Sequence, residues 1–176
     1  MDRPPKLIVL SGLPGVGKSS IAREIATQFD ATWLRVDTLE AAMLSAGIAH
    51  SFETGLAAYQ GCHDMAADQL RLGRSVVVDA VNGVEPARQM WRDLAQMFRA
   101  ERYTIHVVCT DLLEHRRRVE VREAPTPPLP KPTWEEVTHR EFQPWTEAVL
   151  VVDTAGRTGS PVERIIEFIQ ADAPST

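Results

Sequence analysis

The segment Gly12–Ser19 constrains the fold of this chain more than any other part of its 176 residues. It reads GLPGVGKS, which matches the pattern G-x-x-x-x-G-K-[ST], and it lies between an apolar run at 7–10 and a helical pattern that begins near residue 17. In that context the pattern predicts a buried strand, a loop whose backbone N–H groups face anionic oxygens, and a helix whose N-terminal end adds a positive dipole. The segment therefore predicts a phosphate-binding loop on an α/β fold.

Each residue of this loop has an expected part in holding a nucleoside triphosphate. The three glycines permit positive φ and a close approach of the backbone to phosphate. Lys18 is expected to bridge the β- and γ-phosphates, and the Ser19 hydroxyl is expected to ligate Mg²⁺. The expected nucleotide-binding set is Gly12, Leu13, Pro14, Gly15, Val16, Gly17, Lys18, Ser19 and Ser20, the last as a packing or capping residue.

Apolar runs and helical patterns alternate along the rest of the chain. Strands are expected at 7–10, 33–36, 75–78, 104–108 and 149–152, and helices at about 17–28, 37–46, 54–72, 85–100, 111–123, 133–147 and 160–171. Pro144 should kink or end the helix at 133–147. Continuous Val and Ile runs are typical of strands buried on both faces of a parallel sheet. We expect one domain over 1–176, an α/β three-layer sandwich with a five-stranded parallel sheet flanked by helices.

Composition and charge exclude several classes of protein. The formal net charge is −5, which argues against binding of long nucleic acid through the overall field. No apolar run approaches the ~20 residues of a membrane span, and no signal peptide is visible. Cys62 and Cys109 are too few for a disulfide framework or a closed zinc site, so a cytoplasmic protein is expected.

The sequence lacks the patterns of two other classes that share such a loop. A GTPase would carry N-K-x-D, which occurs nowhere, and D-x-x-G occurs only as Asp153–Gly156, after the last expected strand. A motor ATPase would end a strand with two adjacent carboxylates, whereas Asp79 is followed by Ala80. The size and the patterns together favour a compact kinase.

Asp37 is the strongest candidate for a catalytic base. It is expected at the C-terminal end of the strand at 33–36, and the carboxyl ends of strands line the ligand crevice of an open α/β sheet. A carboxylate there accepts the proton of an attacking hydroxyl group. The alternative is that Asp37 only caps the helix that follows.

Asp79 ends the strand at 75–78 and is expected at the same crevice. It is a candidate to hold Mg²⁺ together with Ser19, and the alternative is a buried structural carboxylate. Asn82, shortly after it, is either a further contact or a turn residue before Gly83.

A basic helix leads into a proline-rich segment, Ala124–Pro132. Arg118 and Arg122 are four residues apart and share one helical face, so both are candidates to stabilise charge on the transferred phosphoryl group. The alternative is a solvated face of ion pairs. The proline-rich segment is either a stiff connection or the hinge of a lid, and the lid would span about residues 115–134.

The sequence resembles the small P-loop kinases related to polynucleotide kinase and chloramphenicol phosphotransferase. Three stretches carry the resemblance: Gly12–Ser19, Trp33–Met43, and Val76–Asn82 with Arg88 and Trp91 after it. The second is similar to the segment that bears the catalytic aspartate of chloramphenicol phosphotransferase. The third is similar to the Asp-x-x-Asn…Arg…Trp block of polynucleotide-kinase-like enzymes.

The resemblance implies ATP as the phosphoryl donor and Asp37 as the general base. It also implies that Arg118 and Arg122 contact the donor phosphates and that Thr154, after the last strand, lies near the adenine. One position departs from the family, because polynucleotide kinases have an arginine three residues after the base to grip an acceptor phosphate. Here that residue is Glu40, which would repel one.

We therefore expect an ATP- and Mg²⁺-dependent kinase that acts on a hydroxyl group of a small molecule. The departure at Glu40 and the negative charge argue against a nucleic acid acceptor, and no membrane partner is expected. Two alternatives remain: a nucleic-acid 5′-hydroxyl kinase, and a regulatory ATPase module that acts through a partner.

Overall fold

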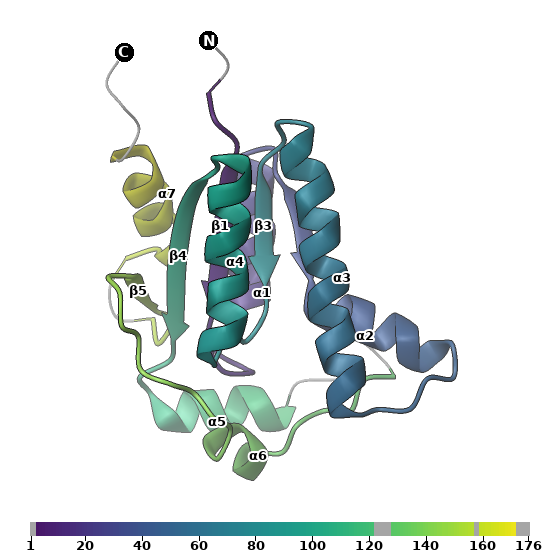
Figure 1. Cartoon of the computed structure of the whole chain (residues 1–176). Coiled ribbons are helices and arrows are strands. Elements are labelled where there is room, and N and C mark those ends of the chain that lie inside the picture. The colour runs from purple at the N-terminus through teal and green to yellow at the C-terminus, as the bar shows by residue number, and fades with distance from the viewer. Residues whose placement is uncertain (1–2, 122–127, 157–158, 172–176) are drawn as a thin grey trace.

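The fold is built on a sheet of five parallel strands in the order β2–β3–β1–β4–β5 (Figure 1). The computed structural model describes residues 3–121, 128–156 and 159–171. The strands are β1 (Lys6–Ser11), β2 (Thr32–Arg35), β3 (Val76–Asp79), β4 (Glu101–Val108) and β5 (Leu150–Asp153). The phosphate-loop strand β1 lies at the centre, so the loop that follows it opens at the middle of the carboxyl edge.

Helices cover both faces of the sheet. They are α1 (Lys18–Gln28), α2 (Val36–Ser45), α3 (Phe52–Arg71), α4 (Glu85–Phe98), α5 (Leu112–Val121), α6 (Trp134–Thr138) and α7 (Pro161–Ala171). One hydrophobic core joins the sheet to α1 and α7, and a second joins the opposite face to α3 and α4. The expected α/β three-layer fold with a five-stranded parallel sheet is confirmed.

The alternation of side chains along the strands explains why two cores form. On β1, Ile8 and Leu10 belong to the core under α1 and α7, whereas Leu7 and Val9 belong to the core under α3 and α4. Successive residues of a strand point to opposite faces, so a continuous apolar run fills both layers. This is the physical basis of the strand predictions, whose limits agree with the structure within a few residues.

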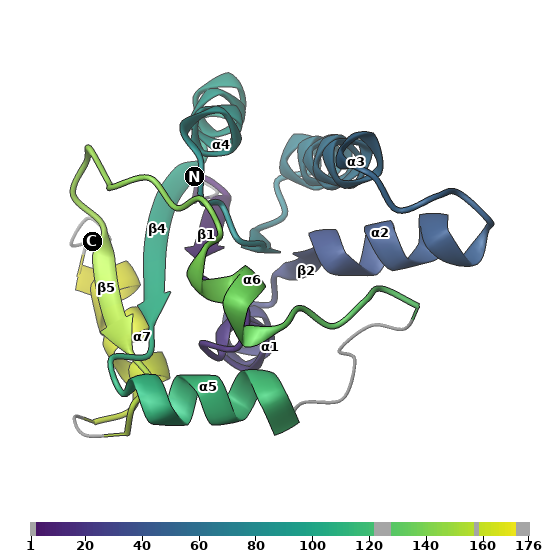
Figure 2. The same cartoon turned by 90° about the horizontal axis from the view of Figure 1, so that it is seen from below.

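Two short helices lie at the carboxyl edge of the sheet. Figures 1 and 2 show α5 and α6 side by side beyond the ends of the strands, with α5 close to the start of α1. The expected helix at 111–123 is observed as α5, although residues 122–127 lie outside the described part of the chain. No helix among the described residues is long and apolar enough to cross a membrane.

The prediction of a helix at 133–147 is wrong beyond residue 138. Thr133 and Glu136 form a capping box that starts α6, which ends at Thr138. Pro144 has no N–H to donate to a helix, and the backbone N–H of Gln143 donates to Gly83 O at 2.8 Å instead. The chain after α6 therefore runs as an irregular strap, which we define as residues 139–149, across the edge of the sheet.

Asn82 is the centre of a buried hydrogen-bond network that joins β1, α3 and α4. Its side chain is fully buried, donates to Leu10 O at 2.8 Å and accepts from Trp91 Nε1 at 2.9 Å. Its backbone N–H donates to the Tyr59 hydroxyl at 3.1 Å, and its carbonyl accepts from Arg88 Nε at 3.0 Å. Asn82, Arg88 and Trp91, which carry part of the resemblance to polynucleotide-kinase-like enzymes, thus lie in a single cluster.

Replacing Asn82 with Ala should lower the free energy of unfolding by about 2–4 kcal/mol, because Trp91 Nε1 and Leu10 O would lose their buried partner. Residue 82 also has φ of 47°, a conformation that Asn tolerates better than Ala. Urea unfolding followed by tryptophan fluorescence measures the change. The matched control is Gln89→Ala on the exposed face of α4, and an equal loss in both variants would contradict the role of the network.

Candidate active site

The phosphate loop turns tightly between β1 and α1. Gly17 precedes the helix with φ of 98°, and Gly15 has φ of 86°. Lys18 opens α1, is only 8% exposed, and donates from Nζ to Leu13 O at 3.0 Å. The side chain thus lies folded over its own loop, where it is available to an anion that the loop would hold.

A cavity of about 350 Å³ opens where the loop meets α5. The residues that line it are Gly15, Gly17, Lys18, Ser19, Ser20, Arg117, Arg118 and Val121. This volume lies within the usual range for small-molecule sites. The structure therefore brings five of the predicted loop residues and the predicted Arg118 together around a single cavity.

The arginines of α5 are oriented by an acidic residue of the same helix. Glu114 Oε1 accepts from Arg118 Nε at 2.8 Å, and Glu114 Oε2 accepts from Arg117 Nε at 2.7 Å. These two hydrogen bonds, that from Arg117 first, lower the pKa of Glu114 to about 2. Arg117 lines the cavity as well, although the sequence analysis names only Arg118 and Arg122 on this helix. Arg122, the other predicted lid arginine, lies outside the described residues.

Thr154 lies against the loop. Its hydroxyl donates to Val16 O at 2.8 Å and accepts from Arg118 Nη1 at 2.8 Å. Its backbone N–H donates to Val108 O at 2.9 Å. Thr154 therefore links α5, β4 and the loop, while its expected position near the adenine stays a prediction.

Asp37 does not end a strand. β2 ends at Arg35 and α2 begins at once with Val36, so Asp37 is in the first turn of α2, half-buried, and Arg35 is the N-cap residue. An acidic side chain in the first turn is stabilised by the helix dipole. The prediction of Asp37 as a strand-end residue and the alternative of an N-cap are both wrong in this detail.

The charge of Asp37 affects three side chains of α2 and α3, which indicates that the four are grouped together. Burial raises the pKa of Tyr59 to about 12 and that of Cys62 to about 11, and in both cases Asp37 adds to the rise. Burial also raises the pKa of Glu40, against the charge of His50, and Asp37 again adds to the rise. Glu40 Oε1 lies 3.4 Å from His50 Nε2.

Asp79 is a buried carboxylate at the end of β3, beside β1. It is 4% exposed and lies 3.6 Å, Oδ2 to Nε, from Arg35. No hydrogen-bond donor among the described residues reaches this oxygen. A buried oxygen without a donor suits a hard cation or its bound water, and a hydroxyl such as that of Ser19 is a suitable second oxygen. Asp79 and Ser19 therefore supply oxygen ligands of the kind that Mg²⁺ takes, and their joint role in holding it stays a prediction.

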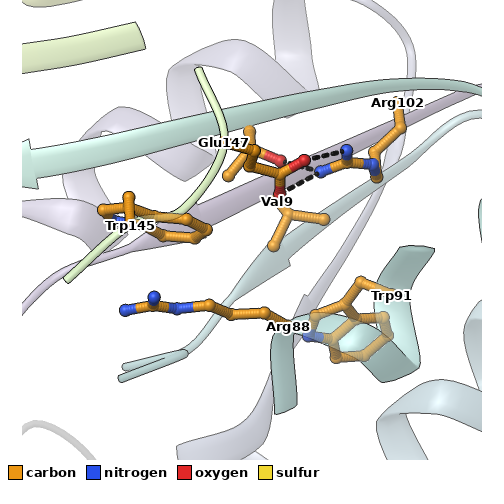
Figure 3. A pocket seen from close by; sticks show the side chains of 7 residues that line it. Val9, Arg88, Trp91, Arg102, Trp145 and Glu147 are labelled. Carbon is orange, nitrogen blue, oxygen red and sulfur yellow. Dashed lines mark hydrogen bonds and ion pairs between the residues drawn. The ribbon is translucent and has the colours of Figure 1, made fainter. Parts of the chain in front are cut away.

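The strap is held in place by residues for which sequence reasoning gave no such role. Arg88 is 3% exposed, donates to Gln143 O at 2.6 Å and to Pro144 O at 2.9 Å, and lies 3.8 Å from the ring centre of Trp145. Figure 3 shows Arg88 beneath Trp145 and, further along the strap, Glu147 paired with Arg102 of β4. Only the tertiary fold brings these positions together, so no local signal identifies them.

The strap also places the positive charge of Arg140 near Glu40 and Tyr59. The charge of Arg140 lowers the pKa of Glu40 and that of Tyr59, in each case as a smaller influence than burial. Arg140 of the strap, Glu40 of α2 and Tyr59 of α3 therefore lie within electrostatic reach of one another.

Comparison with known proteins gives a consistent fold. A family model described as AAA domain matches residues 7–144. A candidate kinase from Chloroflexus aurantiacus is 20% identical, with 96% of this chain and 98% of that one covered and a TM-score of 0.78. No curated protein is similar enough to match the chain.

Two further solved structures were obtained with nucleotides or their analogues. Chaetomium thermophilum Kti12, in complex with ADP-AlF3, is 16% identical over 96% of this chain and 100% of that one, with a TM-score of 0.72. The Mycobacterium tuberculosis APS kinase CysC, in complex with AMPPNP and APS, is 19% identical over 95% and 96%, with a TM-score of 0.68. At these identities the likeness shows a P-loop kinase fold.

Replacing Gly15 with Ala should weaken ATP binding at least about tenfold, because a displaced loop loses hydrogen bonds to phosphate. A Cβ at position 15 would lie 2.6 Å from Val119 Cγ2, so either the loop or α5 must move. Gly73→Ala is the matched control, because Gly73 also has positive φ but meets nothing within 4 Å. Calorimetric titration with ATP distinguishes the two, and equal affinities would contradict the tight packing of α5 on the loop.

Proposed function

The chain belongs to the AAA domain family, and from that premise we propose that it is a kinase that transfers the γ-phosphoryl group of ATP to a hydroxyl group of a small molecule. The observation that carries this proposal is the cavity in which the phosphate loop meets Arg117 and Arg118. A ring of backbone N–H groups, a lysine and mobile guanidinium groups is what phosphoryl transfer requires around the donor.

The donor side acts by neutralising charge. Lys18 and the N–H groups of the loop bind the β- and γ-phosphates, and Arg118 approaches the equatorial oxygens from α5. Ser19 and Asp79 would hold Mg²⁺, which when bound neutralises charge on the β- and γ-phosphate oxygens. Thr154 keeps Arg118 at the mouth of the cavity until a phosphate competes for it.

The acceptor side supplies a base. The hydroxyl oxygen of the acceptor forms a bond to the γ-phosphorus while the bond from that phosphorus to the β–γ bridging oxygen breaks and ADP leaves. The proton of the hydroxyl passes to the carboxylate of Asp37. Half-burial in the first turn of α2 keeps Asp37 oriented and within reach of solvent-borne acceptors.

A small-molecule acceptor fits the charges around Asp37 better than the 5′-hydroxyl end of a nucleic acid, whose backbone carries phosphates. Glu40 lies in the same group of side chains and repels a phosphate. The similarity to an APS kinase supports the same class of acceptor, although it identifies no particular compound. A screen of hydroxyl compounds coupled to ADP release tests the proposal.

The screen has three informative outcomes. ADP release that depends on one small hydroxyl compound supports the proposal. Label transfer from ATP to an oligonucleotide 5′-hydroxyl, with none to small compounds, would replace it with a nucleic-acid kinase. ATP hydrolysis that no acceptor stimulates would replace it with a regulatory ATPase.

Replacing Asp37 with Asn should lower turnover by about 10²–10⁴-fold, because the amide cannot accept the proton. The Kd for ATP should stay within about twofold, because residue 37 is proposed to face the acceptor and not the ATP. Turnover is measured with the acceptor from the screen, and Kd by calorimetry. The matched control is Asp68→Asn on the exposed face of α3, where the side chain is 71% exposed. Wild-type turnover in the Asp37 variant would remove this residue as the base.

Replacing Lys18 with Ala should raise the Kd for ATP at least about tenfold and reduce turnover to background, because a charged hydrogen bond to phosphate is lost. Lys6→Ala is the control, since Lys6 pairs with Glu101 at the opposite edge of the sheet. Unchanged ATP binding in the Lys18 variant would be fatal to the assignment of the loop.

A further inference from the structure

We propose that His115 is a positioning residue for the phosphate loop: it fixes the peptide between Pro14 and Gly15 so that its N–H faces the bound phosphates. This inference deepens the proposed function and rests on it only for the premise that the loop binds a triphosphate. The contacts of α5 with the loop that carry this inference lie in the described part of the chain.

The imidazole of His115 makes a direct contact with the loop backbone. Its Nε2 atom lies 2.8 Å from Pro14 O. A carbonyl oxygen only accepts, so Nε2 carries the hydrogen and donates it. The side chain is 4% exposed, so water does not compete effectively for this carbonyl.

The packing at Gly15 shows that α5 rests on the loop without intervening space. A Cβ at this position would lie 3.3 Å from His115 Cδ2 and 2.6 Å from Val119 Cγ2. His115 and Val119, on two successive turns of α5, therefore pack against Gly15, the residue after Pro14. The contact of His115 is part of an interface and not an isolated hydrogen bond.

The orientation of one peptide group follows from this hydrogen bond. In a trans peptide the C=O and the N–H point in opposite directions. Holding Pro14 O toward His115 therefore turns the N–H of Gly15 away from the imidazole. If the peptide flipped, a carbonyl oxygen would face the phosphates, and the loop would repel the anion that it otherwise binds.

A second peptide of the loop is held in the same manner. Thr154 donates to Val16 O at 2.8 Å, which directs the N–H of Gly17 away from Thr154. Arg118, one turn after His115 on α5, donates in turn to the Thr154 hydroxyl at 2.8 Å. Helix α5 thus fixes the Pro14–Gly15 peptide directly and the Val16–Gly17 peptide through Thr154.

The imidazole is itself oriented by a neighbour from α6. The rings of His115 and Trp134 pack edge to face, with centres 5.1 Å apart and an interplanar angle of 87°. Edge-to-face packing of this kind restricts rotation of the imidazole ring. The donor therefore stays aimed at Pro14 O before any nucleotide arrives, which reduces the cost of ordering the loop on binding.

The test compares variants that lack the donor with one that keeps it. His115→Leu and His115→Phe remove the N–H with different side-chain volumes, and His115→Gln retains an N–H of similar reach. In both variants without the donor we expect the Kd for ATP to rise about tenfold, the effect of one hydrogen bond in a preorganised site. In the Gln variant we expect most of the affinity to return.

The control is Arg116→Ala, on the exposed side of the same helix, which should bind ATP as the wild type does. The melting temperature without nucleotide separates positioning from general damage. Wild-type ATP affinity in both the Leu and Phe variants would overturn the inference. So would a Gln variant no better than Leu, or an affinity loss that appears only where the nucleotide-free protein is also destabilised.

The two proposals fail in different ways. A wild-type protein that binds ATP but transfers its phosphoryl group to no acceptor would refute the kinase assignment, and the comparison of ATP affinities among the His115 variants would still decide the positioning inference. Loss of ATP affinity in the Leu and Phe variants with recovery in Gln would support positioning in either case.

Discussion

The carbonyl groups of the phosphate loop need partners, and this requirement governs how the rest of the site is arranged. A loop whose N–H groups turn inward to an anion turns its carbonyls outward, where a helix or strand ladder does not satisfy them. Here three of these carbonyls have side-chain donors: Leu13 O from Lys18, Pro14 O from His115 and Val16 O from Thr154. The donors come from α1, from α5 and from the segment after β5, so the loop draws distant parts of the chain together.

This arrangement also places a cation that can change partners beside a loop whose carbonyls are held by side chains. Arg118 is shared between Glu114 and Thr154, and both contacts are at the mouth of the cavity. An arginine with partners on each side can exchange one of them for a phosphate oxygen without leaving a buried charge unpaired. His115, by contrast, is deeply buried and contacts only backbone at the loop.

Local sequence patterns predicted the elements well and the connections poorly. The strand limits and the phosphate loop follow from apolar runs and from the GLPGVGKS pattern, because burial and glycine placement are local signals. The strap after α6 was expected to continue as a helix. Its actual path depends on Arg88, more than fifty residues earlier, which binds the carbonyls of Gln143 and Pro144. No pattern in either segment alone contains that information.

The candidate site residues divide in the same way, into those that local patterns indicate and those that only the tertiary fold reveals. Asp37, Asp79 and Arg118 were named as candidates because carboxylates near strand ends and arginines on one helical face are recognisable types, and their roles stay predictions. No local pattern separates His115 from the arginines that follow it, since its contact with the loop depends on where α5 packs. Asn82 was left open between a contact and a turn residue, and the structure makes it the buried centre of a network.

The direct passage from β2 into α2 would limit how the proposed kinase changes its acceptor during evolution. With no loop between Arg35 and Val36, the first turn of α2 follows directly from the sheet, so the carboxylate of Asp37 on that turn has little freedom to relocate. A new acceptor must therefore be accommodated by exchanging the neighbouring side chains of α2, α3 and the strap. Divergence in specificity would leave the proposed proton acceptor stationary and remodel the walls that face it.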